Sequence, residues 1–433
     1  MATASPSADT TTTADEYTAL AGLALEELGR ATTGIHHIHR AVTDRVFSVL
    51  GVRGGAIRPA HDAITDATYT AVHTAFTESS RLADQLIPLV GTRSRREGAE
   101  LSASSRGAFG VAVVNGLIGD RLHAESSPLA IEMAPHADGR PYGTDAASLA
   151  RMHPDATDHV VIFVHGLMET ELAWRHGGRP TYGELLKADV GATPINVRYN
   201  TGLHISENGI LLDRLITDLM TNWPVPIRTI DIVGHSMGGL IARSAGHQGM
   251  GAGSAWIPRV RHVVYLGSPH LGAPAAQGVH YLSAALDRLP ETRPVAGLLR
   301  RRSAGIRDLF HGYLTDDDWR ESDADAIYQM VCQDVELLPT AEHLVVMATV
   351  TRSPRHPLGR IIGDGLVRGP SATGRNKWRH IGFADDAAFE LGRANHFTLL
   401  NNSEVYAWLV ERLRPLPQLP RGTSSKSGEG ESA

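Results

Sequence analysis

Residues 229–243 of the chain read TIDIVGHSMGGLIAR. The apolar run IDIV predicts a buried strand, and GLIAR opens a stretch that favours a helix. Between them lies a Gly-x-Ser-x-Gly motif with Ser236 at its centre. In a strand–turn–helix context this motif is typical of a nucleophilic serine, which a tight turn exposes at the start of a helix. A structural turn rich in Gly and Ser is the alternative interpretation.

Short apolar segments of the same kind recur along the chain and alternate with helical patterns such as residues 208–223. This alternation predicts an α/β fold, with a mostly parallel central sheet covered by helices on both faces. Residues 128–145 contain an Asp-Gly pair after an apolar stretch, which favours a hairpin. The further predicted strands are HVVIFVHG (159–166), PINVRYN (194–200), HVVYLGS (262–268) and HLVVMAT (343–349).

The rest of the chain divides into segments of different character. Apolar residues at three- and four-residue steps predict an extra N-terminal helical region, whose last helix covers residues 105–122. An amphipathic segment interrupts the strands after residue 278 and predicts a helical cap. We expect Leu282, Leu286 and Leu298 of this cap to line the acyl pocket. The predicted organisation is a disordered N-terminus (1–14), a helical region (15–122), a catalytic domain (128–414) with its cap at about 279–320, and a disordered tail (415–433).

A serine that attacks a carbonyl carbon needs hydrogen-bond donors for the oxygen that becomes negative. The backbone N–H of Met237, directly after the serine, is the first predicted donor of this oxyanion hole. The second is the backbone N–H of Leu167, in the loop after the strand that begins at residue 159. His165 lies in the same loop, and we interpret it as a structural residue that braces the loop.

The acid and the base of a catalytic triad are expected after the serine, with the carboxylate before the histidine. Asp364 lies between two glycines, after the strand 343–349, and is the predicted acid. An ordinary Asp-Gly turn is the structural alternative there. Asp385 and Asp386 are the competing carboxylates, and both are also readily explained as solvated charges.

His396 is the predicted general base, because it precedes the pattern of a final helix and can reach the serine from a loop. His380 is interpreted as a surface residue at the start of a strand. His343 lies on the wrong side of Asp364 in the chain order. The predicted triad is therefore Ser236, Asp364 and His396, which would act through an acyl-enzyme intermediate.

Several segments between residues 159 and 402 carry a family resemblance. They are HVVIFVHGLMETELAW, VRYNTGLHISENG, DIVGHSMGGLIAR, VVYLGSPHLGAP, GDGLV and NHFTLLNN. In these segments the chain resembles the bacterial lipase and esterase branch of the α/β-hydrolases. GHSMGG and SPHLGAP are also similar to relatives that cleave lipid-anchor acyl groups. The resemblance implies an α/β-hydrolase fold and carboxylester hydrolysis by Ser236, Asp364 and His396, and it does not cover residues 15–122.

Composition restricts the partners and the cofactors that we expect. The net charge is −6 and the single cysteine is Cys332, so we predict no nucleic-acid partner and no disulfide. No secretory signal and no membrane-spanning segment is apparent, and we predict a cytoplasmic protein without a membrane anchor. We expect a small-molecule ester or lipid substrate, no cofactor and no metal. The apolar faces of the N-terminal helices leave a homo-oligomer open.

The same triad also serves thioesterases and amidases, so the sequence leaves these activities open. A protein that keeps the fold but only binds a ligand is a further alternative. An intact set of serine, aspartate and histidine argues against that alternative.

Overall fold

The computed structural model describes residues 105–127, 129–272, 303–320, 332–352, 356, 363–375 and 379–414. Within these residues the chain forms an eight-stranded sheet in the order β2-β1-β4-β3-β5-β6-β7-β8. Strands β3 to β8 are parallel, and β1 pairs antiparallel with β2 and β4. The strands are β1 (Ala134–Ala137), β2 (Arg140–Pro141), β3 (His159–Val164), β4 (Thr193–Arg198), β5 (Thr229–His235), β6 (Val260–Leu266), β7 (Glu342–Thr349) and β8 (Ala388–Gly392).

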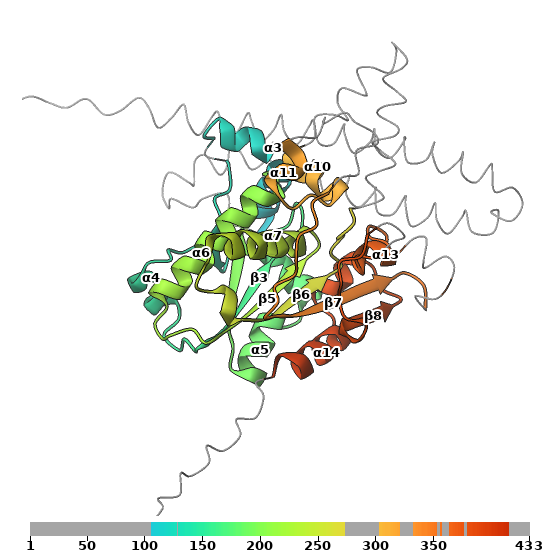
Figure 1. The fold of residues 1–433 in the computed structure, drawn as a ribbon. Helices are drawn as coiled ribbons and strands as arrows, with labels where there is room; N and C mark the ends of the chain where they lie inside the picture. The colour runs from blue at the N-terminus through green and yellow to red at the C-terminus, as the bar shows by residue number, and fades with distance from the viewer. Residues whose placement is uncertain are drawn as a thin grey trace, which may run out of the picture.

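Helices cover both faces of this sheet (Figure 1). On one face α6 and α7 pack on alternate residues of β3, among them Val160 and Ile162. On the other face α5 and α14 pack on the intervening residues, among them Val161 and Phe163. Because both faces are buried, the strands are continuous apolar runs, as the sequence predicted. The helices are α3 (Ser105–Ala124), α4 (Ala146–Met152), α5 (Tyr182–Val190), α6 (Ile205–Asn222), α7 (Met237–Ala252), α10 (Ala304–His311), α11 (Asp316–Arg320), α13 (Gly369–Ala372) and α14 (Ser403–Leu413), with 3-10 turns η3 (Glu171–Gly178), η4 (Ile257–Arg259), η5 (Asp385–Ala387) and η6 (His396–Leu400).

The predicted hairpin joins β1 to β2 through an Asp-Gly turn. Asp138 and Gly139 have φ angles of 48° and 82°, the left-handed conformation that a two-residue hairpin turn requires. The hairpin adds an antiparallel edge to the otherwise parallel sheet. The predicted α/β fold class with a mostly parallel sheet is therefore confirmed.

Helix α3, the described part of the predicted N-terminal helical region, packs against the rest of the protein. The backbone carbonyl of Gly119 accepts a hydrogen bond of 2.9 Å from Asn200 Nδ2, and that of Gly116 accepts one of 2.6 Å from Ser303 Oγ. Asp120 Oδ2 accepts a bond of 2.8 Å from the backbone N–H of Ala304, at the start of α10. In Figure 1, α3, α10 and α11 lie together at one end of the molecule. Residues 15–104 lie outside the described part of the chain.

Of the predicted cap, residues 303–320 are described and form α10 and α11. Buried Asp308 of α10 accepts a bond of 2.8 Å from the backbone N–H of Ile205 and one of 3.0 Å from His204 Nδ1. The His204 ring also stacks on Trp319 of α11, with 3.8 Å between the ring centroids. The cap helices are thus attached to the N-terminus of α6.

Among the described residues, no helix is long and apolar enough to cross a bilayer.

Candidate active site

Ser236 lies in the tight turn between β5 and α7. Its φ and ψ angles are 52° and −120°, a strained conformation for a residue other than glycine. Its backbone N–H donates a bond of 2.9 Å to the carbonyl of Leu266 on β6. A Cβ atom at Gly238 would overlap with the backbone carbonyl of Val164, and one at Gly234 would lie 2.6 Å from Gly239 Cα. The two glycines of the motif are therefore required by close backbone packing around the serine.

Asp364 and His396 form a buried hydrogen-bonded pair. Asp364 Oδ2 lies 2.7 Å from His396 Nδ1. Its other oxygen accepts bonds of 2.9 Å and 2.7 Å from the backbone N–H groups of Leu366 and Val367. These two amides fix the orientation of the carboxylate, which in turn orients the imidazole.

Local backbone features place each member of this pair. Gly363 and Gly365 have φ angles of 63° and 101°, which lets the chain turn sharply on both sides of Asp364. His396 begins η6, a 3-10 turn that the side chain of Asn395 caps. Asp364 follows β7, His396 follows β8 and Ser236 follows β5. The carboxyl ends of these parallel strands lie at one edge of the sheet, so the structure brings all three predicted residues to that edge.

Each residue of the pair shifts the pKa of the other. Burial alone would raise the pKa of Asp364, but the attraction and hydrogen bond of His396 and the two backbone amides lower it below its ordinary value. Burial alone would lower the pKa of His396, but Asp364 and, more weakly, the Glu169 carboxylate raise it. These neighbours thus stabilise the protonated form of His396.

The loop after β3 lies directly against the serine. A Cβ atom built on Gly166 would lie 3.1 Å from Ser236 Cβ. The next backbone N–H, that of Leu167, donates to no acceptor among the described residues. Met237 is the first residue of α7, where a helix has no internal acceptor for the N–H group. Both predicted oxyanion donors therefore flank Ser236 without a competing partner in the described chain.

Two residues beside the serine escaped the sequence analysis. Glu169 Oε2 accepts a bond of 2.7 Å from the backbone N–H of Gly166 and lies 3.0 Å from His235 Nδ1. His235 was visible only as the variable position before the serine. Glu169 carried no local signal, because its partner His235 is 66 residues away along the chain.

The alternative histidines lie in other environments. His165 is buried, stacks on Tyr199 with 4.4 Å between ring centroids, and bonds the Gly166 carbonyl at 2.9 Å. Burial lowers its pKa to about 4, which agrees with a bracing role in the loop. His343 bonds the Tyr265 hydroxyl and the Leu338 carbonyl, at 2.8 Å and 3.1 Å. His380 is exposed.

The remaining predicted site residues are either exposed or outside the described part of the structure. Asp386 is exposed and lies in η5, and the side chain of Asp385 is outside the described part of the structure. The predicted acyl-pocket residues also lie outside the described residues; they are Leu282, Leu286 and Leu298. Within the described residues, no group of three or more His, Cys, Asp and Glu side chains is placed to hold a metal ion.

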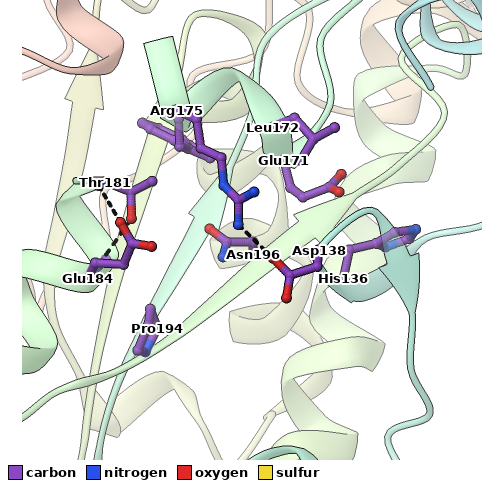
Figure 2. A pocket seen from close by; sticks show the side chains of 11 residues that line it. His136, Asp138, Glu171, Leu172, Arg175, Thr181, Glu184, Pro194 and Asn196 are labelled. Carbon is purple, nitrogen blue, oxygen red and sulfur yellow. Dashed lines mark hydrogen bonds and ion pairs between the residues drawn. The ribbon is translucent and has the colours of Figure 1, made fainter. Parts of the chain in front are cut away.

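A separate pocket lies between η3, α5 and the β1–β2 hairpin (Figure 2). Its carboxylates already have partners. Asp138 pairs with Arg175 at 2.7 Å, and Glu184 accepts a bond of 2.7 Å from the backbone N–H of Thr181. Glu171 pairs with buried Arg198 at 2.6 Å. None of the three predicted triad residues lines this pocket, so it is distinct from the candidate active site.

The PGAP1-like alpha/beta domain family matches residues 207–329. No curated protein matches the sequence. The Bacillus licheniformis lipase BlEst2 in its propeptide form is 17% identical over 58% of this chain and 50% of that chain, with a TM-score of 0.38. This chain therefore spans half of that lipase.

Two archaeal esterases are similar to the same extent. The Pyrococcus furiosus esterase Pf2001 is 15% identical over 60% of this chain and 82% of its own, with a TM-score of 0.33. The Pyrobaculum calidifontis esterase is 13% identical over 58% of this chain and 75% of its own, with a TM-score of 0.34. The strand order, the serine turn after β5 and the family match together give the chain an α/β-hydrolase fold.

Proposed function

We propose that the protein is a serine carboxylester hydrolase with Ser236 as nucleophile, His396 as general base and Asp364 as the orienting acid. The observation that carries the proposal is the buried bond of 2.7 Å between Asp364 and His396, at the sheet edge that also carries the strained serine. A serine in a strained turn, together with such a pair, is the arrangement that acyl transfer needs.

The reaction follows from the roles of these groups. His396 takes the proton of the Ser236 hydroxyl while the serine oxygen attacks the ester carbonyl carbon. The backbone N–H groups of Leu167 and Met237 stabilise the negative oxygen of the tetrahedral intermediate. When the C–O bond breaks, His396 protonates the leaving alcohol and the acyl group stays on Ser236. Water, deprotonated by His396, then releases the carboxylic acid and restores the enzyme.

The test compares the wild type with Ser236→Ala on p-nitrophenyl esters, acyl thioesters and anilides. We expect ester hydrolysis by the wild type and a loss on the order of 10⁴–10⁶ in turnover for the variant, as for other serine hydrolases that lack a triad member. A fluorophosphonate probe should label the wild type and not the variant. Faster turnover of thioesters or anilides would assign the protein to those classes. A wild type that neither turns over nor reacts with the probe would point to a binding protein instead.

We also propose that the cap contributes Leu282, Leu286 and Leu298 to an apolar acyl pocket. Each buried methylene contributes about 0.8 kcal/mol, so a polar substitution should weaken the hydrolysis of long acyl esters more than that of short ones. The measurement is kcat/KM over a chain-length series for Leu282→Ser, Leu286→Ser and Leu298→Ser, each confirmed to be folded. A uniform loss at all chain lengths would contradict this role.

A further inference from the structure

Glu169, a nearly buried carboxylate, lies beside Ser236. The proposed reaction assigns no role to this carboxylate. Its side chain is 11% exposed. One oxygen, Oε2, accepts the bond of 2.7 Å from the backbone N–H of Gly166 and also lies 3.0 Å from His235 Nδ1. Because a carboxylate only accepts hydrogen bonds, the His235 ring nitrogen is the donor in the second contact. A single oxygen atom thus bonds to two segments that are distant in sequence, the loop after β3 and the end of β5.

Each of these two segments carries one of the predicted oxyanion donors. Gly166 directly precedes Leu167, and His235 stands two residues before Met237. The segments are in direct contact, because a Cβ atom at Gly166 would lie 3.0 Å from both Glu169 Oε2 and His235 Nδ1. Glu169 therefore links the two segments that carry the donors.

The same contact extends to the loop that carries the general base. His235 Nε2 lies 3.3 Å from the backbone carbonyl of His396, and the two imidazole centroids are 4.7 Å apart. The His235 side chain is completely buried, so its ring nitrogens have no contact with bulk solvent. The connected groups are Glu169, the Gly166 amide, the His235 ring and the backbone of His396.

We propose that Glu169 is a positioning residue that sets the geometry of the oxyanion hole by joining the loop after β3 to the serine turn. The inference rests on the proposed esterase function. An oxyanion hole acts only when its donors are fixed at the place where the charge develops. Loss of the link should therefore weaken binding of the transition state and leave binding of the substrate nearly unchanged.

The experiment compares Glu169→Ala with Glu169→Gln. Alanine removes the link, whereas the single carbonyl oxygen of glutamine can accept both bonds that Oε2 accepts now. Glu171→Gln is the matched control, because Glu171 lies only two residues away, at the start of η3, and is a buried carboxylate that pairs with Arg198 instead. All rates are expressed per active site titrated with a fluorophosphonate, so that unfolded protein does not lower the measured kcat.

For Glu169→Ala we expect kcat to fall by about 10- to 100-fold with KM nearly unchanged, less than the roughly 10²–10³-fold loss from removing an oxyanion donor outright. Glu169→Gln should keep most of kcat. The affinity for a trifluoromethyl ketone, which forms an oxyanion on the serine, should fall in parallel with kcat/KM. Glu171→Gln should lose stability but keep its kcat per titrated site.

A purely structural role predicts a different result. The titratable fraction of Glu169→Ala would fall, while its kcat and its affinity for the ketone stayed at the wild-type level. That result, or equal kcat losses in Glu169→Gln and Glu169→Ala, would overturn the positioning role. An inactive wild type that fails to react with the fluorophosphonate would instead reject the proposed function, which separates the two failures.

Discussion

At position 236 the backbone holds a serine in a conformation that costs on the order of 1–3 kcal/mol. The strain persists because the surrounding backbone leaves the turn little freedom. Gly234 and Gly238 have no room for a side chain, and the Ser236 amide is bonded to β6. The sequence predicted this turn because the glycines that permit the close packing are part of the motif itself.

The choice of acid is testable at the level of single residues. Asp364→Asn should leave the protein folded but lower kcat by about 10⁴-fold, as for an analogous aspartate-to-asparagine change in a serine protease, because the imidazole loses its orienting anion. Asp386→Asn is the control, since Asp386 is exposed, and its kcat should equal that of the wild type. Ester kinetics of both variants provide the measurement. A larger loss in Asp386→Asn would move the acid to that residue.

The raised pKa of His396 predicts the pH dependence of the reaction. The base must be neutral to accept the serine proton, and its ordinary pKa of 6.5 is raised in the folded protein. The value of kcat/KM should therefore rise with pH, with a midpoint above 6.5. The pH profile with a p-nitrophenyl ester checks this prediction. A midpoint below that value would show that His396 is not the base or that Asp364 does not act on it.

At the scale of elements, the buried strands were predictable because a continuous apolar run has few other solutions in a soluble protein. Strand β8 was not predicted, because its short sequence AFELG is only partly buried at the edge of the sheet.

The final helix also begins later than its pattern suggested. Asn402 caps α14 with bonds to the amides of Glu404 and Val405, which leaves His396 in a separate 3-10 turn.

The attachment of α10 to α6 gives a prediction about stability and pH. Burial raises the pKa of Asp308 above its ordinary 3.8, although His204 and the Ile205 amide oppose this. The folded state thus favours the protonated carboxyl more than the unfolded state does, so this stabilisation is complete below pH 3.8 and is lost as pH rises through the folded pKa. The asparagine of Asp308→Asn stays neutral at every pH. The free energy of unfolding of this variant, relative to that of the wild type, should therefore increase as pH rises from about 4 to 7.

Urea unfolding at several pH values measures this difference. Asp308→Ala is the control, because it leaves the buried Ile205 amide without its acceptor and should lose about 1–3 kcal/mol. If the wild type instead became more stable relative to Asp308→Asn as pH rises, the charged carboxylate would stabilise the attachment.

At the scale of the whole molecule, the sequence could not show where α3 packs. Its contacts are far apart along the chain: Ser303 is 187 residues from Gly116, and Asn200 is 81 residues from Gly119. The small residues of α3 permit close packing but do not identify the partner. The structure shows that α3 reaches the loop beside the serine, because a Cβ atom at Gly116 would overlap with the side chain of Met168. Helix α3 thus supports the same loop that carries Leu167.

Two other glycines of α3 offer a matched test of its packing on the loop after β4. A Cβ atom at Gly119 would overlap with Asn200, whose side chain also accepts a bond of 2.9 Å from the Gly202 amide, whereas nothing lies within 4 Å of one at Gly110. Gly119→Ala should therefore lose about 1–3 kcal/mol by overpacking. Gly110→Ala should gain about 0.5–1 kcal/mol, because alanine favours a helix. Urea unfolding of both variants measures the difference, and equal stabilities would show that α3 does not pack on Asn200, in the loop after β4, in solution.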